Sequence, residues 1–455
     1  MQLPDGPKLH PIVQSINWIR KPLQYLEECA EKYGNIFTIK LSGVKPLVII
    51  SDPEAIKQIF TFQSENINVS SKNNLLLPII GENSLLLLNG SRHKRERKII
   101  MPSFHGEKVK SYAETICKIT EKVASQWEID RSFPAIAATQ TITLEVIIQT
   151  VFGFRTGKRY EEIKPLLENW AKILSSPAGA SFLFFKFLQI DLGAWSPWGN
   201  FIRNRQQIND LLQAEIEDRR AHPEQQGNDI LSLMLSARDE AGQPMNDEQL
   251  KGELLTLLLA GHRTTAISLA WAFYWINHKI EIKEKLLQEI DSLGENPDPI
   301  AISRLPYLTA FCQEVLRIYP VFPTALARMP KSRFTLMGRQ FEAGTVLMPC
   351  IYLTHHREDL YPNSKEFRPE RFLERQYTNY EFIPFGGGVR LCVGYALAML
   401  EMKLVVATIL SKYELALVDN ELPKPKRTGL SLAPSNGIPL VMKGLRESKK
   451  ILTLN

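Results

Sequence analysis

Residues 385–403 read FGGGVRLCVGYALAMLEMK, and in this stretch a cysteine lies between a glycine-rich loop and a strongly helical run. A free cysteine is usually a buried thiol, which is one interpretation of Cys392. The other is a metal-binding thiolate, because Cys392 is expected to open the helix, whose N-terminal dipole and free N–H groups stabilise a thiolate. The neighbouring residues favour the second interpretation.

This stretch fits the pattern F-x-x-G-x-R-x-C-x-G at every fixed place, which are Phe385, Gly388, Arg390, Cys392 and Gly394. Each place has a use if the Cys392 sulfur binds a haem iron. Glycine lets the backbone approach a flat macrocycle, and Arg390 can pair with a haem propionate. A thiolate ligand donates electron density to iron and favours O–O cleavage. Five matches in one frame predict a haem-thiolate site with Cys392 as the metal ligand.

Composition sets broad limits on the protein. The chain has 455 residues and 44% hydrophobic residues, which is enough to bury a sizeable core. Its net charge of +6 is too diffuse to predict nucleic-acid binding. The five cysteines are odd in number and form no CxxC pair, which indicates a reducing, cytoplasmic compartment. The N-terminus lacks a signal-peptide pattern and is too broken by proline and charge to anchor the chain in a membrane, so we expect a soluble protein.

Periodicity predicts a single domain, 1–455, that is mainly α with small β-sheets. The expected helices cover residues 105–128, 140–153, 159–175, 201–220, 246–278, 282–293, 307–318 and 393–412. Short strands are expected within 33–52, 333–347 and 428–442, forming a β-rich subregion.

The longest expected helix, 246–278, is apolar on almost every side and is therefore predicted to be buried. Asn246 can cap it, with Gln249 returning the hydrogen bond. A membrane span is the competing interpretation, but His262 and Arg263 near its centre would be costly in lipid.

The stretch QEVLRIYP places Glu314 and Arg317 on one helix face. An exposed ion pair would contribute little, but the flanking residues are apolar, which indicates burial. A buried pair needs further partners, and Arg371 of FRPERF (367–372) is a candidate.

With LAGHRTT, EVLR, FRPERF and FGGGVRLCVG following one another in the family's order, the chain resembles the cytochrome P450 superfamily of haem-thiolate monooxygenases over nearly its whole length. The resemblance implies a triangular prism of helices around one haem b (iron protoporphyrin IX), with Cys392 as the axial ligand. It also implies that Glu314, Arg317 and Arg371 form a structural triad. SRHKRERKIIMPSF and LLLAGHRTT further resemble the retinoic-acid hydroxylase branch.

Three more residues are expected at the haem propionates. Arg328 in PTALARMP lies where the family often binds a propionate, although a surface arginine is the alternative. The family pattern W-x-x-x-R is represented by His93 and Arg97, and histidine keeps a ring N–H donor in place of tryptophan. The alternative for His93 is a solvated basic turn.

A basic cluster follows, formed by Lys94, Arg95 and Lys98. The family docks acidic electron donors on this face, so the resemblance implies a ferredoxin or flavodoxin with its reductase. A solvated face without a partner is the alternative.

The oxygen-activating segment departs from the family pattern A-G-x-[acid]-T-T, because Arg263 stands in place of the acid. Thr264 matches the threonine that helps to deliver protons to bound O2. Its hydroxyl can bond the carbonyl four residues back and loosen the helix. Arginine cannot shuttle protons at neutral pH, so the route is expected to use Thr264, water and His262, or to differ from the usual one.

The substrate pocket is expected to be mostly apolar, and so is the substrate, a retinoid or other isoprenoid acid. The expected walls come from 75–80, 257–260, 321–326 and the tip at 433–437. The residues chosen to represent them are Leu76, Leu257, Ala260, Phe322 and Ser435. The run ASFLFFKFL (180–188) is either a core helix or an entrance lid with shallow membrane contact.

Three functions remain open. The first is an O2-dependent monooxygenase fed by a separate redox partner. The second is an H2O2-dependent, fatty-acid-type peroxygenase in which Arg263 holds a carboxylate; the retained Thr264 and the lack of a proline after Arg263 argue against it. The third is a non-catalytic haem sensor, against which Thr264 and the apolar pocket both count.

Overall fold

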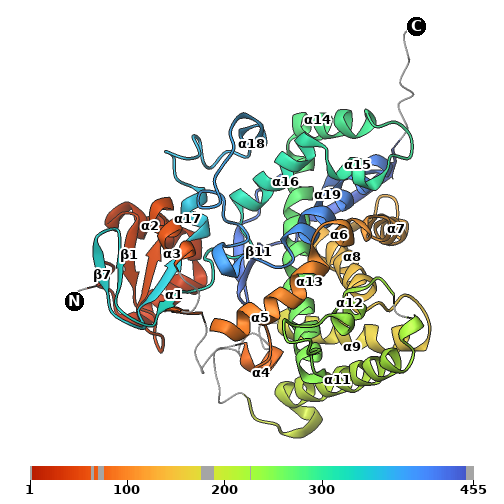
Figure 1. The fold of residues 1–455 in the computed structure, drawn as a ribbon. Helices are drawn as coiled ribbons and strands as arrows, with labels where there is room; N and C mark the ends of the chain where they lie inside the picture. Colours follow the sequence, from red (N-terminus) through yellow and green to blue (C-terminus); the bar gives the residue numbers. More distant parts are fainter. Residues whose placement is uncertain (1–2, 63–65, 70–75, 176–188, 226, 447–455) are drawn as a thin grey trace.

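The fold is dominated by helices with small sheets, as the sequence predicts (Figure 1). The computed structural model describes residues 3–62, 66–69, 76–175, 189–225 and 227–446. The helices are α1 (Pro11–Arg20), α2 (Pro22–Tyr33), α3 (Pro53–Thr61), α4 (Leu77–Ile80), α5 (Gly90–Ile100), α6 (Glu107–Lys110), α7 (Ala113–Ala124), α8 (Ala135–Thr150), α9 (Lys158–Ser175), α11 (Pro197–Ala221), α12 (Ile230–Ser236), α13 (Asp247–His278), α14 (Ile280–Asp291), α15 (Pro299–Ser303), α16 (Pro306–Ile318), α17 (Ile351–His355), α18 (Arg371–Glu374) and α19 (Tyr395–Lys412). The strands are β1 (Ile36–Ile39), β2 (Leu47–Ile50), β3 (Ile67–Asn68), β4 (Ser132–Pro134), β5 (Met329–Pro330), β6 (Phe334–Leu336), β7 (Arg339–Phe341), β8 (Val346–Pro349), β9 (Tyr413–Leu417), β10 (Pro425–Thr428), β11 (Ser431–Pro434) and β12 (Pro439–Leu445).

Helix α13 runs through the centre of the helical part of the molecule (Figure 1). It begins with the predicted capping box, in which the N–H of Gln249 donates to the Asn246 side chain and the Gln249 side chain accepts from the N–H of Asn246, both at 2.9 Å. It packs against α8, α16 and α19, and Trp271 is fully buried. The prediction of a buried central helix is confirmed to within one residue.

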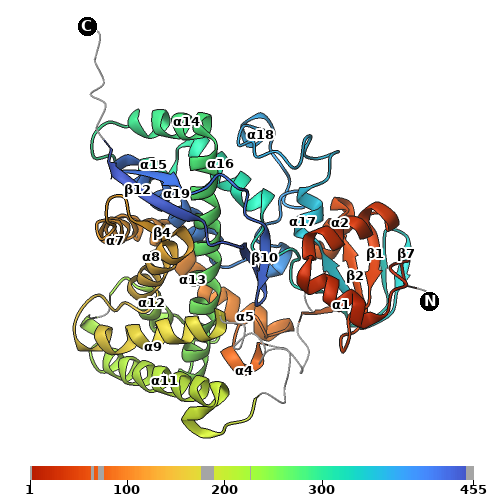
Figure 2. The ribbon, with the colours of Figure 1, turned by 180° about the vertical axis from the view of Figure 1, so that it is seen from behind.

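The strands form several small sheets. In the first, β2 pairs antiparallel with β1 and parallel with β8, so residues 33–52 and 333–347 do come together. Residues 428–442 do not join them: they contribute to the separate β10–β11 hairpin and to the β4–β12–β9 sheet. The expected β-rich subregion is therefore divided: β12 lies far from β1 and β2 (Figure 2), and β11 packs on α13.

Helices α1, α2, α3 and α5 are absent from the sequence-based set of helices. Proline explains three of these differences, because Pro11, Pro22 and Pro53 each stand in the first turn of a helix. A proline there leaves no hydrogen bond unmade, so it marks a helix start where the sequence suggested a break.

The structure tests only one of the two expectations about membranes. Within the described ranges, no helix is both long and apolar enough to cross a bilayer. The run 180–188, expected as a core helix or an entrance lid, lies outside the described residues.

Candidate active site

Cys392 is held in the loop that leads into α19. Its N–H donates to the carbonyl of Phe385 at 3.0 Å, and Gly394 is the N-cap of α19. Cys392 therefore does not open the helix as expected but lies two residues before its N-cap. Burial raises the pKa of the Cys392 thiol, while the backbone N–H of Gly394 and the charge of Arg97 lower it. A cation bound to the sulfur would offset the desolvation of the thiolate.

Close packing explains two of the glycines in this loop. A Cβ on Gly387 would lie 2.3 Å from the Phe60 ring, and one on Gly388 would lie 2.3 Å from the Phe60 carbonyl oxygen. Gly388 also has φ +62°, which favours glycine. Its immediate role is thus close packing against α3, whereas the expected role was approach to a macrocycle. At Gly394, by contrast, a Cβ would meet nothing within 4 Å, so that side of the loop leaves space for a flat group.

His93, Arg97, Arg328 and Arg390 come together near this loop, although they derive from three distant parts of the chain. Arg328 Nη2 donates to the Gly387 carbonyl at 3.2 Å, and Arg390 Nη1 donates to the Leu85 carbonyl at 3.2 Å. Across the described ranges, none of these three arginines forms an ion pair with a carboxylate. The cluster thus concentrates positive charge without a protein anion.

The pKa values of these groups show what the cluster lacks. Burial, followed by Arg328 and Arg97, lowers the pKa of Arg390 to about 9, and burial lowers that of Arg328 to about 10. Burial and the three arginines lower the pKa of His93 to about 3, so its ring is neutral and keeps one N–H donor. A ligand with two carboxylates would relieve this repulsion. The residues therefore fit the propionates of a haem whose iron lies at Cys392.

Glu314, Arg317 and Arg371 form the expected buried triad. Arg317 Nε and Nη2 donate to the two Glu314 oxygens at 2.6 and 2.8 Å, and Arg371 Nε donates to Glu314 Oε1 at 3.1 Å. The carbonyls of His355, Ser364 and Glu366 accept the remaining Arg317 N–H groups. Since Glu314 and Arg317 have no exposed surface, these bonds are what makes their burial tolerable.

Sequence reasoning missed His355, which connects the triad with the cysteine loop. Its Nδ1 lies 3.3 Å from the Arg317 carbonyl and its Nε2 accepts from the N–H of Ile383 at 2.9 Å. Burial, and then the charge of Arg317, lowers its pKa well below the usual value, which keeps Nε2 free to accept. The adjacent histidines 355 and 356, next to a buried apolar run, were the one available signal.

Thr264 Oγ1 donates to the Ala260 carbonyl at 2.5 Å, which is the predicted bond to the residue four positions back. The expected loosening is not observed, because α13 is continuous through this turn. His262 faces α8, where Nδ1 lies 3.0 Å from Thr143 Oγ1, and burial lowers its pKa to about 4. His262 therefore points away from Thr264, and its expected part in a proton route has no support in this geometry.

Arg263 reaches strand β11. Its Nε donates to Ser431 Oγ at 3.3 Å, and burial lowers its pKa. In the described part of the chain it has no carboxylate partner. A half-buried guanidinium with one neutral partner remains free to bind an anion.

The predicted pocket residues separate into two groups. Leu257, Ala260 and Thr264 follow one face of α13 by their spacing. Phe322 retains 39% exposure, and its neighbour Val321 accepts from the N–H of Leu432, which joins this segment to β11. These segments therefore meet, as expected.

Leu76 and Ser435 are the remaining residues that were predicted to line the substrate pocket. Leu76 is half-buried before α4, which packs on α13. Ser435 lies elsewhere than predicted, because the turn between β10 and β11 falls at 429–430 and Ser435 follows β11, with its N–H donating to Lys424. The hairpin residue beside α13 is Ser431, which sequence reasoning missed.

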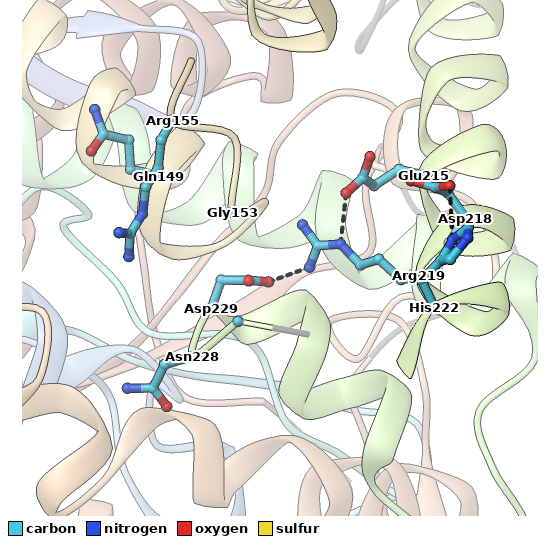
Figure 3. Close-up of a pocket in the computed structure, with 10 residues that line it drawn as sticks. Gln149, Gly153, Arg155, Glu215, Asp218, Arg219, His222, Asn228 and Asp229 are labelled. Carbon is cyan, nitrogen blue, oxygen red and sulfur yellow. Dashed lines mark hydrogen bonds and ion pairs between the residues drawn. The ribbon is translucent and has the colours of Figure 1, made fainter. Parts of the chain in front are cut away.

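A cavity of about 290 Å³ lies between the end of α8, α11 and α12, remote from Cys392 in the chain (Figure 3). Three of its charged lining residues are paired with one another, since Arg219 bridges Glu215 and Asp229 at 2.6 Å on each side. These ion pairs bind helices together and leave the cavity without the apolar walls of the predicted pocket.

The expected basic cluster is largely neutralised. Arg95 pairs with Asp239 at 2.7 Å and Lys98 pairs with Glu240 at 2.6 Å, while Lys94 is exposed. The face therefore presents less positive charge than the sequence suggests.

Comparisons with known proteins agree with this site. The family model described as Cytochrome P450 matches residues 4–441. A protein of Mycobacterium tuberculosis, provisionally named cytochrome P450 135B1, is 32% identical over 454 residues, covering 98% of this chain and 93% of its own. A second from that organism, provisionally named cytochrome P450 137, is 31% identical and covers 89% and 82%. Among solved structures, retinoic acid bound cyanobacterial CYP120A1 matches with a TM-score of 0.83 and 25% identity, covering 98% of this chain and 100% of that one.

Proposed function

This chain belongs to the cytochrome P450 family and is a haem-thiolate monooxygenase, and we propose that it hydroxylates a retinoid or other isoprenoid acid. The observation that carries the proposal is Arg263, a half-buried cation of α13 that has no carboxylate partner in the described ranges. The likeness to a cyanobacterial protein with retinoic acid bound supports the same substrate class.

Haem supplies, when bound, the iron chemistry that activates O2. Cys392 would provide its sulfur ligand, and Arg97, Arg328 and Arg390 would bind its propionates, with a ring N–H of His93 as a further donor. The triad and His355 would keep the loop from Ile383 to Cys392 in place. We expect the arginines, the triad and His355 to act through position and charge alone.

Thr264 would hold and pass protons at Oγ1. Its hydroxyl now donates to the Ala260 carbonyl, and a change of rotamer would turn it toward a water molecule. Arg263 cannot release a proton at neutral pH, and His262 is turned toward α8. Water is therefore the proposed source of protons behind Thr264.

Arg263 would bind the substrate carboxylate, with Ser431 fixing the guanidinium. The exposed side chains of Phe322 and Leu326 would contact the apolar body of the substrate. This arrangement orients an acid by one charged end and one apolar body, as expected of a small-molecule site.

The same residue supports a second candidate, an H2O2-dependent peroxygenase of fatty acids. In that case a substrate carboxylate bound at Arg263, next to Thr264 in sequence, would replace the acidic side chain that the family pattern has at this position. Thr264 offers no support for the third candidate, a haem sensor without catalytic activity.

The electron donor is proposed to be a separate ferredoxin or flavodoxin with its reductase. The family resemblance supports this proposal, whereas the basic cluster adds little to it, since Arg95 and Lys98 are paired and Lys94 alone is left to meet an acidic partner. We propose a cytoplasmic location, because the five cysteines are not joined in disulfides.

The test is spectroscopic. The reduced protein with carbon monoxide should show the red-shifted Soret band of thiolate ligation, and Cys392→Ala should abolish it. Titration with retinoids, terpenes and fatty acids, read by the iron spin state, then identifies the substrate class. If retinoids and other isoprenoid acids leave the spectrum unchanged while another class shifts it, the proposed substrate is wrong. Turnover with ferredoxin, reductase and NADPH supports the monooxygenase, whereas turnover with H2O2 alone supports the peroxygenase.

A further inference from the structure

Two hydroxyls of α13 bond to carbonyls of their own helix beside the candidate site. Thr264 Oγ1 donates to the Ala260 carbonyl at 2.5 Å, and Ser268 Oγ donates to the Thr264 carbonyl at 3.2 Å. Because α13 is continuous here, these carbonyls also accept the backbone N–H four residues on. A hydroxyl that shares the acceptor weakens the backbone bond and favours bending of the helix.

Helix α8, which packs along α13, supplies two more hydroxyls from the nearly opposite side (Figure 1). Thr143 Oγ1 donates to the His262 carbonyl at 3.0 Å, and Thr139 Oγ1 donates to the Ala266 carbonyl at 2.9 Å. Each residue turns a helix by about 100°, so positions 262 and 266 share one side of α13. Every second carbonyl from 260 to 266 therefore has a hydroxyl donor in addition to its backbone donor.

The His262 ring fixes the direction of the Thr143 hydroxyl. Its Nδ1 lies 3.0 Å from Thr143 Oγ1, and burial keeps the ring neutral because it lowers the pKa of His262 to about 4. An N–H at Nδ1 donates to Oγ1 and leaves the hydroxyl proton for the His262 carbonyl, which satisfies both contacts. Gly261 lets the two helices approach this closely, since a Cβ there would lie 3.1 Å from Ile147 Cδ1.

These hydroxyls reduce the cost of opening α13 locally. Opening separates a backbone N–H from its carbonyl, and a buried carbonyl that is left without a donor is costly. Here the His262 carbonyl would keep the Thr143 hydroxyl and the Ala266 carbonyl would keep that of Thr139. Only the released N–H groups would then need water. Gly261 weakens the same segment further, because glycine loses more conformational freedom in a helix than other residues.

We propose that Thr143 and Thr139 are positioning residues that allow the 260–266 segment of α13 to open, so that water reaches Thr264. They act through the α13 backbone, from the side of the helix that faces away from Thr264. This role rests on the proposed part of Thr264 in proton transfer and does not depend on which substrate is used. The continuous helix described above is then the closed state of the segment.

The experiment is hydrogen exchange of the haem-loaded protein without substrate, followed by mass spectrometry over residues 258–270. Thr143→Val and Thr139→Val each remove one α8 hydroxyl, whereas Thr143→Ser keeps it. The matched control is Thr150→Val, because Thr150 is also buried on α8 but its hydroxyl donates to the Val146 carbonyl of its own helix. The C–O stretching band of the carbon monoxide complex is recorded for each variant, since it responds to hydrogen bonds from nearby water.

We expect Thr143→Val to slow exchange in this segment by about 5- to 100-fold, which is the cost of an orphaned carbonyl expressed as an equilibrium constant. Thr139→Val should act in the same direction, while Thr143→Ser and Thr150→Val should exchange as the wild type does. Since less water would then reach the haem pocket, the C–O band of Thr143→Val should move to higher frequency.

Unchanged or faster exchange in Thr143→Val, equal slowing in Thr150→Val, a C–O band that stays in place, or a Thr143→Ser variant that behaves like Thr143→Val would each overturn the proposal. Thr264→Val distinguishes this failure from a failure of the proposed function. If Thr264→Val leaves the C–O band unchanged, the part assigned to Thr264 is wrong and the proposal falls with it, even where exchange is slowed. A different substrate class would change none of these results, because they are measured without substrate.

Discussion

Arg317 Nε lies 2.6 Å from Glu314 Oε2 in an ion pair from which water is entirely excluded. Burying two charges costs more than their attraction returns unless every remaining hydrogen-bonding group is satisfied. Here Arg371 and the N–H of Arg368 also donate to Glu314 Oε1. The pair therefore unites α16, α18 and the segment between them, and through His355 it reaches the loop of Cys392.

Removing the carboxylate should be severely destabilising. Glu314→Ala leaves two arginines buried without their anion, and we expect a loss of about 3–5 kcal/mol in the free energy of unfolding. Chemical denaturation measures it, and haem content should fall with it. The control is Glu114→Ala, which breaks the exposed pair with Lys118 and should change little. Equal effects of the two substitutions would contradict this account.

His355 is predicted to act as a positioning residue for the cysteine loop. His355→Phe leaves the N–H of Ile383 buried without an acceptor, at a cost of about 1–3 kcal/mol. His355→Gln offers an oxygen to the same N–H and should recover part of the loss. The specific readout is the Soret band of the carbon monoxide complex, which should lose thiolate character in the Phe variant first. An unchanged spectrum at reduced stability would mean that His355 serves the fold alone.

The raised pKa of Glu253 predicts that the stability of the fold depends on pH. Burial raises its pKa to about 8, the N–H of Leu85 lowers it, and Glu96 raises it. Glu253 Oε1 accepts from that N–H at 2.6 Å, and the Leu85 carbonyl accepts from Arg390, so the acid supports the cation cluster. In the folded state the carboxyl stays neutral to about pH 8, whereas in the unfolded chain it ionises near its ordinary pKa.

The difference between the folded-state and unfolded-state pKa fixes the direction in which stability changes with pH. Because the folded-state pKa is raised, the contribution of Glu253 is fully present below the unfolded-state pKa and is lost as the pH rises toward 8, by up to about 1.4 kcal/mol per pH unit. Glu253→Gln has no such loss. The stability of the variant relative to wild type should therefore increase from pH 5 to pH 8, as measured by urea unfolding at each pH. A constant difference across this range would show that Glu253 is ionised in the fold.

Sequence alone predicted the parts of this molecule that are determined locally. The capping box of Asn246 and Gln249 placed α13 to within one residue, and the motif around Cys392 located the loop before α19 that we propose binds haem. The hydroxyls that α8 donates to α13 could not be predicted, because a threonine in a helical pattern does not show which neighbouring helix it faces. The tip of the β10–β11 hairpin was misplaced for a similar reason: 429–430 and 435–436 both form turns, and only the contact between Arg263 and Ser431 distinguishes the turn beside α13.

Arg263 should make the site bind acidic ligands more tightly than neutral ones. Its guanidinium has Ser431 as its one hydrogen-bond partner in the described structure, and a charge-assisted bond to a ligand carboxylate would contribute about 1.5–3 kcal/mol. Arg263→Leu should therefore weaken the binding of retinoic acid by about 10- to 100-fold, since 1.4 kcal/mol corresponds to a factor of ten. The methyl ester of the same acid should bind the two proteins alike. Spin-state titration measures all four affinities, and Ser431→Ala is the control, because it removes the partner but keeps the charge. If the acid and the ester lose affinity equally in Arg263→Leu, the arginine shapes the pocket without reading the charge, and both the acid substrate and the peroxygenase alternative lose their basis.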